Sequence, residues 1–431
     1  MATTMQLKKQ IQEGVYDAAF SALYGSEPAT LAAQRERYST LVDRFAEEYG
    51  ADREVRLYSA PGRTEIGGNH TDHNNGVVMA AAVNLDVVAV VSPNEDNVVR
   101  VKSYGFDKID DVDLSILTPQ KREMEHSAGL IRGVAAGFVE AGGKVGGFDA
   151  YTTSDVLRGS GLSSSAAFEV CMGAIFRGEY NDNDMEKFSQ VKIAQIGQYA
   201  ENVFFGKPCG LMDQMASSVG NIITIDFADP AHPVVEPVQV DFSKAGLALC
   251  ILDSGADHAD LTDEYAAIPA DCRAVAAVCG GEVLRDVPFE TFLAKLPECR
   301  RQCGDRAVLR AFHIYADNDR VAKQVDALRA DDFKTFLALV TESGLSSWEY
   351  LQNVIPAGYK EHQEVAVTIA AAKHFLHGEG AVRVHGGGFA GTVQAFVPLT
   401  RLDSFKTEME AILGKGRCHI LSIRPEGGAV L

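Results

Sequence analysis

Residues 158–167 read Arg-Gly-Ser-Gly-Leu-Ser-Ser-Ser-Ala-Ala, and this segment decides how the rest of the chain is interpreted. It stands directly before a predicted helix whose apolar residues recur at i, i+3, i+4 and i+7: Phe168, Cys171, Met172 and Ile175. A Gly-Ser loop that leads into a helix presents backbone N–H groups at the positive end of the helix dipole, where phosphate binds. Serine is also a favoured N-cap, but a cap accounts for one serine only. The segment therefore predicts a phosphate-binding loop. It is not of the Walker type, because no G-x-x-x-x-G-K-[ST] sequence occurs.

Upstream, residues 62–76 (GRTEIGGNHTDHNNG) place several glycines among many hydrogen-bonding side chains. Ligand contacts concentrate on loops held by a rigid scaffold, and so dense a set of donors and acceptors suits a polyhydroxylated ligand such as a sugar. Two alternatives stay open from this segment alone. One is a turn-rich surface loop, and the other is metal binding by His70, Asp72 and His73.

Downstream, residues 386–391 formally match the dinucleotide pattern G-x-G-x-x-G. The residues that follow, 392–398, predict a strand rather than the helix that a dinucleotide site requires. We therefore expect a tight glycine turn between two strands, close to a ligand.

Around these segments, helical and strand-like patterns mix in a way that predicts an α+β protein. A strand is expected at residues 54–59 and ends at Pro61-Gly62, with another at 83–92. The turn-rich region 230–245 is the predicted domain boundary. Further helices are predicted at residues 38–45, 196–203, 319–328, 333–341 and 362–375, and further strands at 222–227, 382–384 and 393–397.

Two acidic residues stand near these segments without a distinctive pattern. Glu201 lies off the apolar stripe of its predicted helix, which by itself indicates a solvated carboxylate. Asp213 follows a glycine-containing turn, which by itself indicates a helix N-cap. Pattern alone assigns neither of them to a site.

The composition excludes several classes of protein. The chain has 431 residues and a formal net charge of −19, so nucleic acid is not expected as a partner. No apolar run is long enough to span a membrane, and residues 1–14 lack the apolar stretch of a secretory signal. Among eight cysteines, the spacing of Cys272, Cys279, Cys299 and Cys303 does not match common zinc motifs, which favours reduced thiols in the cytoplasm. A chain of this length predicts two packed domains.

The three segments, in this order and together with Cys-Gly-Leu-Met-Asp-Gln at residues 209–214, resemble the galactokinase branch of the GHMP small-molecule kinases from about residue 30 onward. Residues 62–76 are similar to its signature G-R-x-N-x-I-G-E-H-T-D-Y-N-x-G, residues 157–167 to its phosphate loop, and residues 386–391 to its C-terminal turn. The resemblance implies an N-terminal domain (1–235) like the second domain of ribosomal protein S5. It also implies a ferredoxin-like C-terminal domain (236–431), with the site between the two.

The resemblance further implies transfer of the ATP γ-phosphoryl group to the anomeric hydroxyl of galactose, with Mg²⁺ and without an obligate protein partner. Asp213 matches the residue that accepts or stabilises the proton of that hydroxyl, and Arg63 matches the arginine that lowers its pKa. Ser165 and Glu201 match the Mg²⁺ ligands. The remaining matches are ATP contacts at Gly159, Ser160, Gly161, Ser163, Ser164 and Ser165, and sugar contacts at Asn69, His70, Asp72, Gly210 and Tyr265.

The departures from the family pattern cluster near the sugar. Asn69 replaces a glutamate that approaches the 6-hydroxyl, Glu65 replaces an asparagine, and His73 replaces a tyrosine. Two further departures are Leu157 and Ala390, and the arginine pair that usually follows the Tyr265 motif is missing. Loss of a negative charge near C6 makes galacturonate a candidate substrate, and N-acetylgalactosamine is another. A non-catalytic galactose sensor is the alternative of a different class, which the retained Arg63, Asp213 and serine loop argue against.

Overall fold

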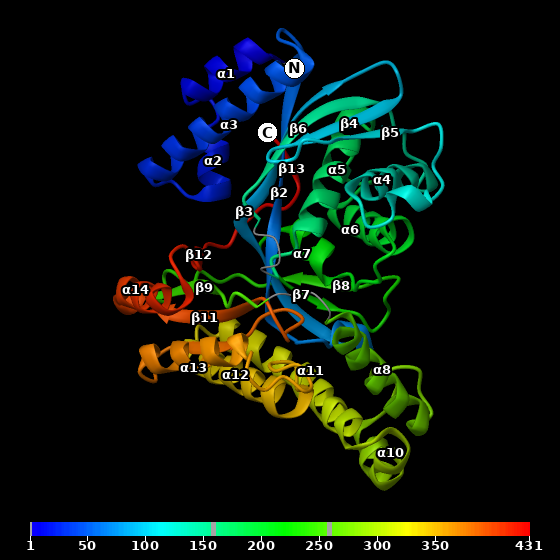
Figure 1. Ribbon diagram of the computed structural model, residues 1–431, viewed down its shortest axis with the longest axis vertical. Helices are drawn as coiled ribbons and strands as arrows, with labels where there is room; N and C mark the ends of the chain where they lie inside the picture. Colours follow the sequence, from blue (N-terminus) through cyan, green and yellow to red (C-terminus); the bar gives the residue numbers. More distant parts are fainter. Residues whose placement is uncertain (1, 157–160, 257–260) are drawn as a thin grey trace.

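A nine-stranded sheet forms the upper part of the molecule in Figure 1, a computed structural model that describes residues 2–156, 161–256 and 261–431. Its main path runs β1-β2-β3-β6-β4-β5, with β7 and β8 extending from β3 and with β13 beside β2. The strands are β1 (Ala2–Thr3), β2 (Glu54–Gly67), β3 (Val77–Pro93), β4 (Val98–Ser103), β5 (Ile109–Asp113), β6 (Phe148–Ser154), β7 (Ile222–Asp226), β8 (Val234–Pro237) and β13 (Ala429–Val430).

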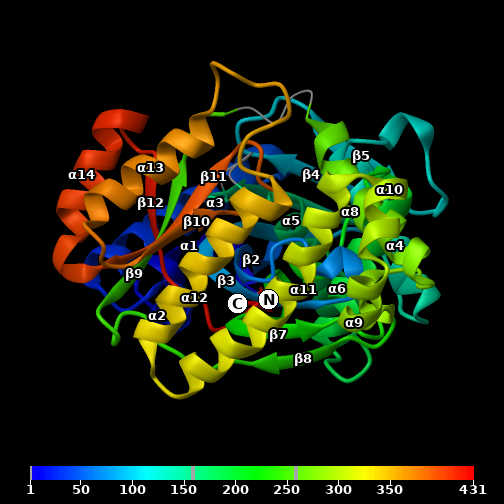
Figure 2. The same cartoon turned by 90° about the horizontal axis from the view of Figure 1, so that it is seen from below.

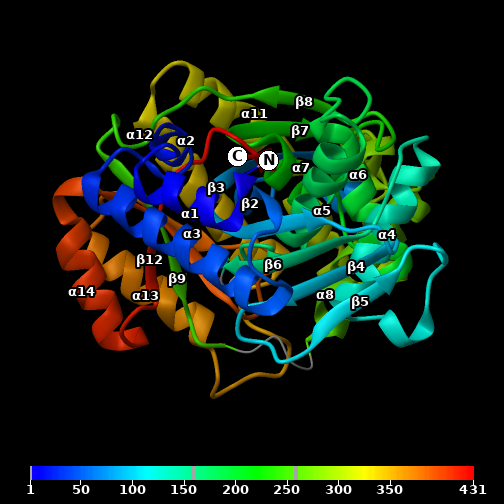
Figure 3. The same cartoon turned by 90° about the horizontal axis from the view of Figure 1, so that it is seen from above.

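Alternating side chains give this sheet two buried faces. Leu57, Val88 and Val90 face the N-terminal helices α1 (Thr4–Gln12), α2 (Asp17–Tyr24) and α3 (Pro28–Tyr49). Val87, Ala89 and Val91 face the other side, which carries α4 (Ser127–Glu140), α5 (Ser164–Tyr180), α6 (Gln190–Tyr199) and α7 (Met212–Val219). The sheet is therefore covered by helices on both faces (Figures 1 and 3).

A second, four-stranded sheet of order β10-β11-β9-β12 lies below the first in Figure 1, and long helices lie beneath it. In Figure 2, which views the molecule from below, these helices are in front. The strands of the second sheet are β9 (Leu247–Asp253), β10 (Ala381–Val384), β11 (Thr392–Pro398) and β12 (Cys418–Leu421). The helices are α8 (Thr262–Cys279), α9 (Phe289–Ala294), α10 (Leu296–Cys303), α11 (Asp305–Arg329), α12 (Phe333–Ser346), α13 (Glu364–Leu376) and α14 (Leu402–Leu413). Short helical turns are η1 (Asp72–Asn74), η2 (Lys121–Glu123), η3 (Ala200–Phe205), η4 (Leu284–Asp286), η5 (Ser347–Leu351) and η6 (Leu399–Arg401).

The α+β prediction is confirmed. Within the described residues, β4 and β6 pair in parallel and the other paired strands are antiparallel. The chain passes from one sheet to the other between Pro237 and Leu247, and β13 later returns it to the first sheet. The division into residues 1–235 and 236–431 stays a prediction.

The prediction that Pro61-Gly62 ends a strand is wrong, because β2 continues to Gly67. The register against β3 shifts between Pro61 and Arg63, so the proline lies at a bulge. On the other side of β2, β13 pairs only with Tyr58 and Ser59. Proline is tolerated at such a place, where no ladder hydrogen bond is lost. The bulge falls immediately before Arg63.

Candidate active site

Arg63 and Asp213 form a bidentate ion pair where β2 meets α7. Nε and Nη2 of Arg63 donate to the two carboxylate oxygens of Asp213 at 2.7 and 2.6 Å. The arginine is mostly buried, whereas 29% of the Asp213 side chain is exposed. A carboxylate held in this way is fixed in orientation and is still reachable by a ligand.

Asp213 lies in the first turn of α7, and Leu211 occupies the N-cap position, so the interpretation of Asp213 as an N-cap is wrong. Its carboxylate instead accepts the hydroxyl of Ser163 at 2.7 Å. Burial acts to raise the pKa of Asp213, but the charge of Arg63 and the bond from Ser163 outweigh burial and lower it. Asp213 is therefore ionised at neutral pH.

The predicted phosphate loop ends beside this pair. Gly159 and Ser160 lie outside the described residues. The backbone N–H of Arg63 donates to the Leu162 carbonyl at 3.0 Å, and its guanidinium donates to the Gly161 carbonyl. Ser163 occupies the N-cap of α5 in a left-handed conformation without a side-chain cap bond. The first N–H groups of α5, which begins with Ser164, thus lack intrahelical partners at the loop that we expect to bind phosphate.

Ser165 and Glu201 bring two oxygen donors together on the neighbouring helices. The hydroxyl of Ser165 donates to Oε1 of Glu201 at 3.2 Å. Only 3% of Glu201 is exposed, so its interpretation as a solvated carboxylate is wrong. The physical reason is the π-helical turn η3, which begins at Ala200 and breaks the α-helical periodicity.

A second buried carboxylate, Glu169, lies one helical turn after Ser165 on α5 and was not among the residues predicted from the sequence. Nε2 of Gln214 donates to Glu169 at 3.0 Å and to Glu201 at 2.8 Å. Burial and the neighbouring Glu201 raise the pKa of Glu169 well above its usual value. Gln214 directly follows Asp213 on α7. The same helical turn therefore positions both the Arg63–Asp213 pair and the Glu201 carboxylate to which Gln214 donates.

Three of the residues predicted to bind sugar, Asn69, His70 and Asp72, lie on the segment between β2 and β3. Nε2 of His70 donates to the Gly387 carbonyl at 3.0 Å. Burial and His73 lower the pKa of His70 to about 4, so the ring is neutral and keeps Nδ1 as an acceptor. Asp72 approaches Gly210 so closely that a Cβ on that glycine would lie 2.3 Å from its carboxylate. Glycine at position 210 therefore allows the approach.

Asn69 differs from the other expected sugar contacts, because it is fully buried and its side chain is saturated with hydrogen bonds. Its amide nitrogen donates to Glu65 at 3.1 Å and to the Gly386 carbonyl at 2.7 Å. Its oxygen accepts from Asn353 at 2.8 Å and from Ser347 at 3.2 Å. Glu65 in turn pairs with the buried Arg383. Position 69 itself carries no carboxylate. The Glu65 carboxylate lies beside it, and Arg383 compensates the charge of Glu65.

The glycine turn between β10 and β11 is confirmed, and hydrogen bonds join it to the segment 62–76 and to Tyr265. Its carbonyls accept from Asn69, from His70 and Asn353, and from the hydroxyl of Tyr265, which reaches Gly388 at 2.8 Å. The adjoining His385 contacts Thr64 at 3.0 Å. Tyr265 is therefore brought into the same cluster.

Helix α11 holds the backbone of this segment, which sequence reasoning missed. The Asp317 carboxylate accepts the N–H of Asn69 at 2.8 Å, and Nε2 of His313 donates to the Asn69 carbonyl at 3.0 Å. Both residues are buried on a long helix, and no sequence pattern marks them, because their partner Asn69 is distant in the chain.

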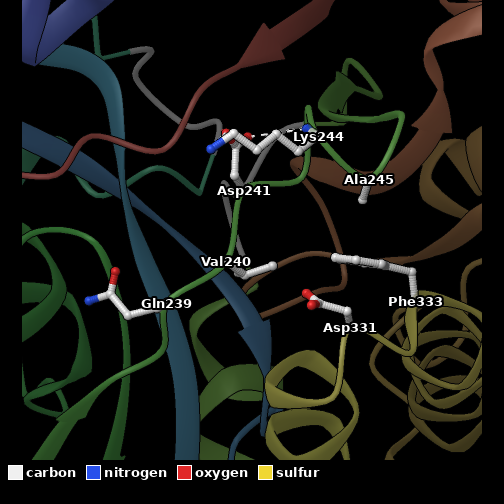
Figure 4. Close-up of a pocket in the computed structure, with 7 residues that line it drawn as sticks. All are labelled: Gln239, Val240, Asp241, Lys244, Ala245, Asp331 and Phe333. Carbon is white, nitrogen blue, oxygen red and sulfur yellow. Dashed lines mark hydrogen bonds and ion pairs between the residues drawn. The ribbon is translucent and has the colours of Figure 1, made fainter.

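Other features of the described residues do not extend this cluster. No group of three His, Cys, Asp or Glu side chains that could hold a metal ion occurs there. A cavity of about 600 Å³ opens between Asp241, Lys244, Asp331 and Phe333 (Figure 4), and none of its lining residues belongs to the predicted site.

Comparison with known proteins decides the family. The Galactokinase galactose-binding signature matches residues 43–93, and the GHMP kinases N terminal domain matches residues 129–221. Galactokinase of Actinobacillus pleuropneumoniae is 33% identical over 84% of this chain and 90% of its own length. The chain belongs to the galactokinase family. Galactokinase of Streptomyces coelicolor is 30% identical over 90% of this chain and 97% of its own length.

The fold agrees with this membership. The crystal structure of Lactococcus lactis galactokinase complexed with galactose superimposes with a TM-score of 0.78 at 24% identity, covering 92% of this chain and all of that one. Members of the galactokinase family are GHMP kinases, phosphotransferases with an alcohol acceptor that use ATP to phosphorylate galactose, and this is the activity that the family match assigns. None of the helices in the described part of the chain combines the length and apolar character needed to cross a membrane.

Proposed function

We propose that the chain transfers the γ-phosphoryl group of ATP to the anomeric hydroxyl of galactose, with Asp213 accepting or stabilising the proton of that hydroxyl. The observation that carries this proposal is the two-pronged Arg63–Asp213 pair, which receives a bond from Ser163 at the start of α5. An ionised carboxylate beside the expected phosphate loop can act on a hydroxyl bound between them. Arg63 offsets charge on the transferring group.

We further propose that Mg²⁺ accompanies ATP and that Ser165 and Glu201 hold it. A hydroxyl and a carboxylate 3.2 Å apart suit a hard cation that takes its other ligands from phosphate and water. When bound, the ion would neutralise phosphate charge. The phosphates themselves would meet residues 159–161 and 163–165.

For the sugar, we propose contacts from His70, Asp72, Gly210 and Tyr265. Asn69 contributes differently from the expectation, because its side-chain hydrogen bonds are all made within the protein, and its role is to shape the segment that carries His70. The argument for a C6 acid assumes that the Asn69 side chain faces the sugar. It loses its basis because that side chain instead contacts Glu65, Gly386, Ser347 and Asn353. Galactose is therefore the substrate that we propose.

The test is an ADP-release assay with galactose, galacturonate and N-acetylgalactosamine in the presence of Mg²⁺, with ³¹P NMR of the product. We expect turnover of galactose to galactose 1-phosphate, and loss of that turnover in Asp213→Ala. Preferred turnover of galacturonate or N-acetylgalactosamine would overturn the proposed substrate. Absence of turnover with all three sugars would favour a sensor.

We also propose a cytoplasmic location, consistent with eight free cysteines.

A further inference from the structure

The loop between η3 and α7 carries a cation, Lys207, that the proposed function does not use. Its Nζ lies 3.8 Å from Oε1 of Glu201, the same oxygen that accepts the Ser165 hydroxyl at 3.2 Å. The Glu201 side chain is buried, whereas 67% of the Lys207 side chain is exposed. The ammonium therefore lies at the outer edge of the two oxygen donors that we propose for Mg²⁺.

Hydrogen bonds fix the backbone around Lys207. The Glu201 carbonyl accepts the N–H groups of Gly206 and Lys207 at 3.0 and 3.1 Å, which ends η3 and places Lys207 beside Glu201. Farther along the loop, the Asn202 side chain accepts the N–H of Cys209 at 2.7 Å. The loop is therefore held on both sides of Lys207, while the long and exposed side chain can change rotamer without moving the loop.

Lys207 has hydrogen-bond donors available, whereas each side-chain nitrogen of Arg63 already donates. Nε and Nη2 of Arg63 donate to Asp213, and Nη1 donates to the Gly161 carbonyl. An ammonium has three donors. Within the described structure Lys207 uses none of them in a hydrogen bond, because its contact to Glu201 is 3.8 Å long. Both cations lower the pKa of Asp213 by their charge, so Lys207 lies within electrostatic range of the expected proton acceptor.

We propose that Lys207 is a phosphate-binding residue: when ATP binds, its ammonium leaves Glu201 and donates to the γ-phosphate. The movement follows from charge, because a triphosphate attracts the ammonium more strongly than one carboxylate does, and because the Glu201 oxygen is needed for Mg²⁺ in the proposed function. The γ-phosphate is the expected partner, since it must approach the hydroxyl held at Asp213. This inference rests on the proposed function, because it assumes that ATP phosphate meets the start of α5.

The transfer does not consume the proton of Lys207. The anomeric oxygen of galactose bonds to the γ-phosphorus as the bond from that phosphorus to the bridging oxygen of ADP breaks, and the hydroxyl proton passes to Asp213. Lys207 stays protonated throughout and offsets the negative charge on the transferring group, a role that adds to that of Arg63.

The experiment measures kcat and the KM values for the full chain and its variants, together with the Kd for ATP and for ADP with Mg²⁺ by calorimetry. In Lys207→Met, we expect the Kd for ATP to rise about tenfold and kcat to fall at least as much, the size of one lost charge-assisted hydrogen bond. The Kd for ADP, which has no γ-phosphate, and the KM for galactose should stay unchanged. Lys207→Arg should recover part of both losses. Lys244→Met is the matched control, because it removes an exposed lysine from a pair with Asp241.

These variants should fold, because an exposed ion pair contributes little to stability, and melting temperatures check this. Lys207→Gln, which keeps a polar side chain without the charge, should behave like Lys207→Met. An unchanged Kd for ATP and an unchanged kcat in Lys207→Met would overturn the inference and leave Lys207 as a surface partner of Glu201. An equal rise in the Kd for ATP and for ADP would overturn it as well, because the contact would then not be with the γ-phosphate. Failure of the proposed function is distinguishable, since the unaltered chain would then lack turnover of galactose, whereas calorimetry with ATP tests Lys207 independently of turnover.

Discussion

At the scale of single residues, the proposed chemistry depends on keeping Asp213 charged although its surroundings are largely shielded from water. Burial alone would favour the neutral acid, and the adjacent guanidinium reverses that preference. The Asp213 side chain is 29% exposed and is bonded on both oxygens, so its orientation is set before the substrate arrives.

We expect Asp213→Asn to lower kcat about 10²- to 10⁴-fold, the range typical of losing a positioned proton acceptor, with little change in the KM for ATP. ADP release at saturating galactose measures the effect. Asp229→Asn, an exposed carboxylate that pairs with His232, is the control and should retain full activity. A kcat within tenfold of the parent value would contradict the role of Asp213.

The pH dependence follows from the direction of the Asp213 pKa shift. Because Arg63 lowers that pKa, the ionised form persists as the pH falls below the usual range of an aspartate. In Arg63→Met, only Ser163 and Lys207 still oppose the effect of burial on the pKa of Asp213, so the acid limb of kcat/KM should move to higher pH. Profiles of kcat/KM against pH test this expectation, with Arg285→Met, from an exposed pair with Asp226, as the control. Superimposable acid limbs in the parent and Arg63→Met would show that Asp213 is not the titrating group.

Asn69→Glu is expected to destabilise the protein rather than to adjust its sugar preference. The new carboxylate would be fully buried beside Glu65 and would face the Gly386 carbonyl, which cannot donate a hydrogen bond. An uncompensated buried charge costs about 3–5 kcal/mol. Urea denaturation should show a loss of this order, and Gln239→Glu, at an exposed position, should show none. Stability equal to that of the parent chain would mean that the segment rearranges around the new charge.

At the scale of elements, the spacing of glycines identifies the three segments in the sequence. The residues that hold these segments in place cannot be identified in the same way. Isolated polar residues within apolar strands and helices, such as Arg383, His313 and Asp317, give no periodic signal, and their partners are distant in the chain. The prediction of a solvated Glu201 is wrong because a π-helical turn changes the direction of its side chain. The prediction that the strand ends at Pro61 is wrong because a bulge accommodates the proline. The candidate site was therefore predictable in its loops and unpredictable in what holds them.

Helix α11 offers a test of this support. In Asp317→Ala, the buried N–H of Asn69 loses its acceptor, which costs about 1–3 kcal/mol and loosens the segment that carries His70. We expect the KM for galactose to rise about tenfold, while the KM for ATP stays constant. Asp319→Ala is the matched control, because Asp319 is exposed on the same helix. A change confined to the KM for ATP would show that α11 does not act on the sugar segment.

At the scale of the whole molecule, both ends of the described chain meet on β2: β1 pairs with Val55, and β13 pairs with Tyr58 and Ser59 (Figure 1). Arg424, from the segment between β12 and β13, is fully buried against Asp86. The net charge of −19 excluded nucleic acid as an expected partner, but it carried no information about nucleotide binding. In the proposed function, local groups such as Arg63 and the start of α5 favour nucleotide binding instead.

Arg424→Met should therefore lower stability markedly. It removes one of two arginines from a buried carboxylate and three hydrogen bonds to the carbonyls of Ser59, Glu426 and Gly427. We expect a loss of about 3–5 kcal/mol in urea denaturation. Arg417→Met, from the half-exposed pair with Asp253, should lose less than 1 kcal/mol. Equal losses in the two variants would contradict a structural role for the buried arginine.

The position of β13 beside the strand that carries Arg63 also has a consequence during biosynthesis. The first sheet takes most of its strands from residues 2–237, which leave the ribosome early, yet the arginine that compensates Asp86 comes from residue 424 and the edge strand from Ala429–Val430. Until those residues emerge, the nascent chain carries a buried carboxylate that Arg37 alone compensates, and an uncovered stretch of β2. The strand that carries Arg63 therefore gains its last pairing partner, β13, only after the other strands of both sheets have been synthesised. An interrupted translation product, which lacks this partner, would be the form most exposed to chaperones and proteases.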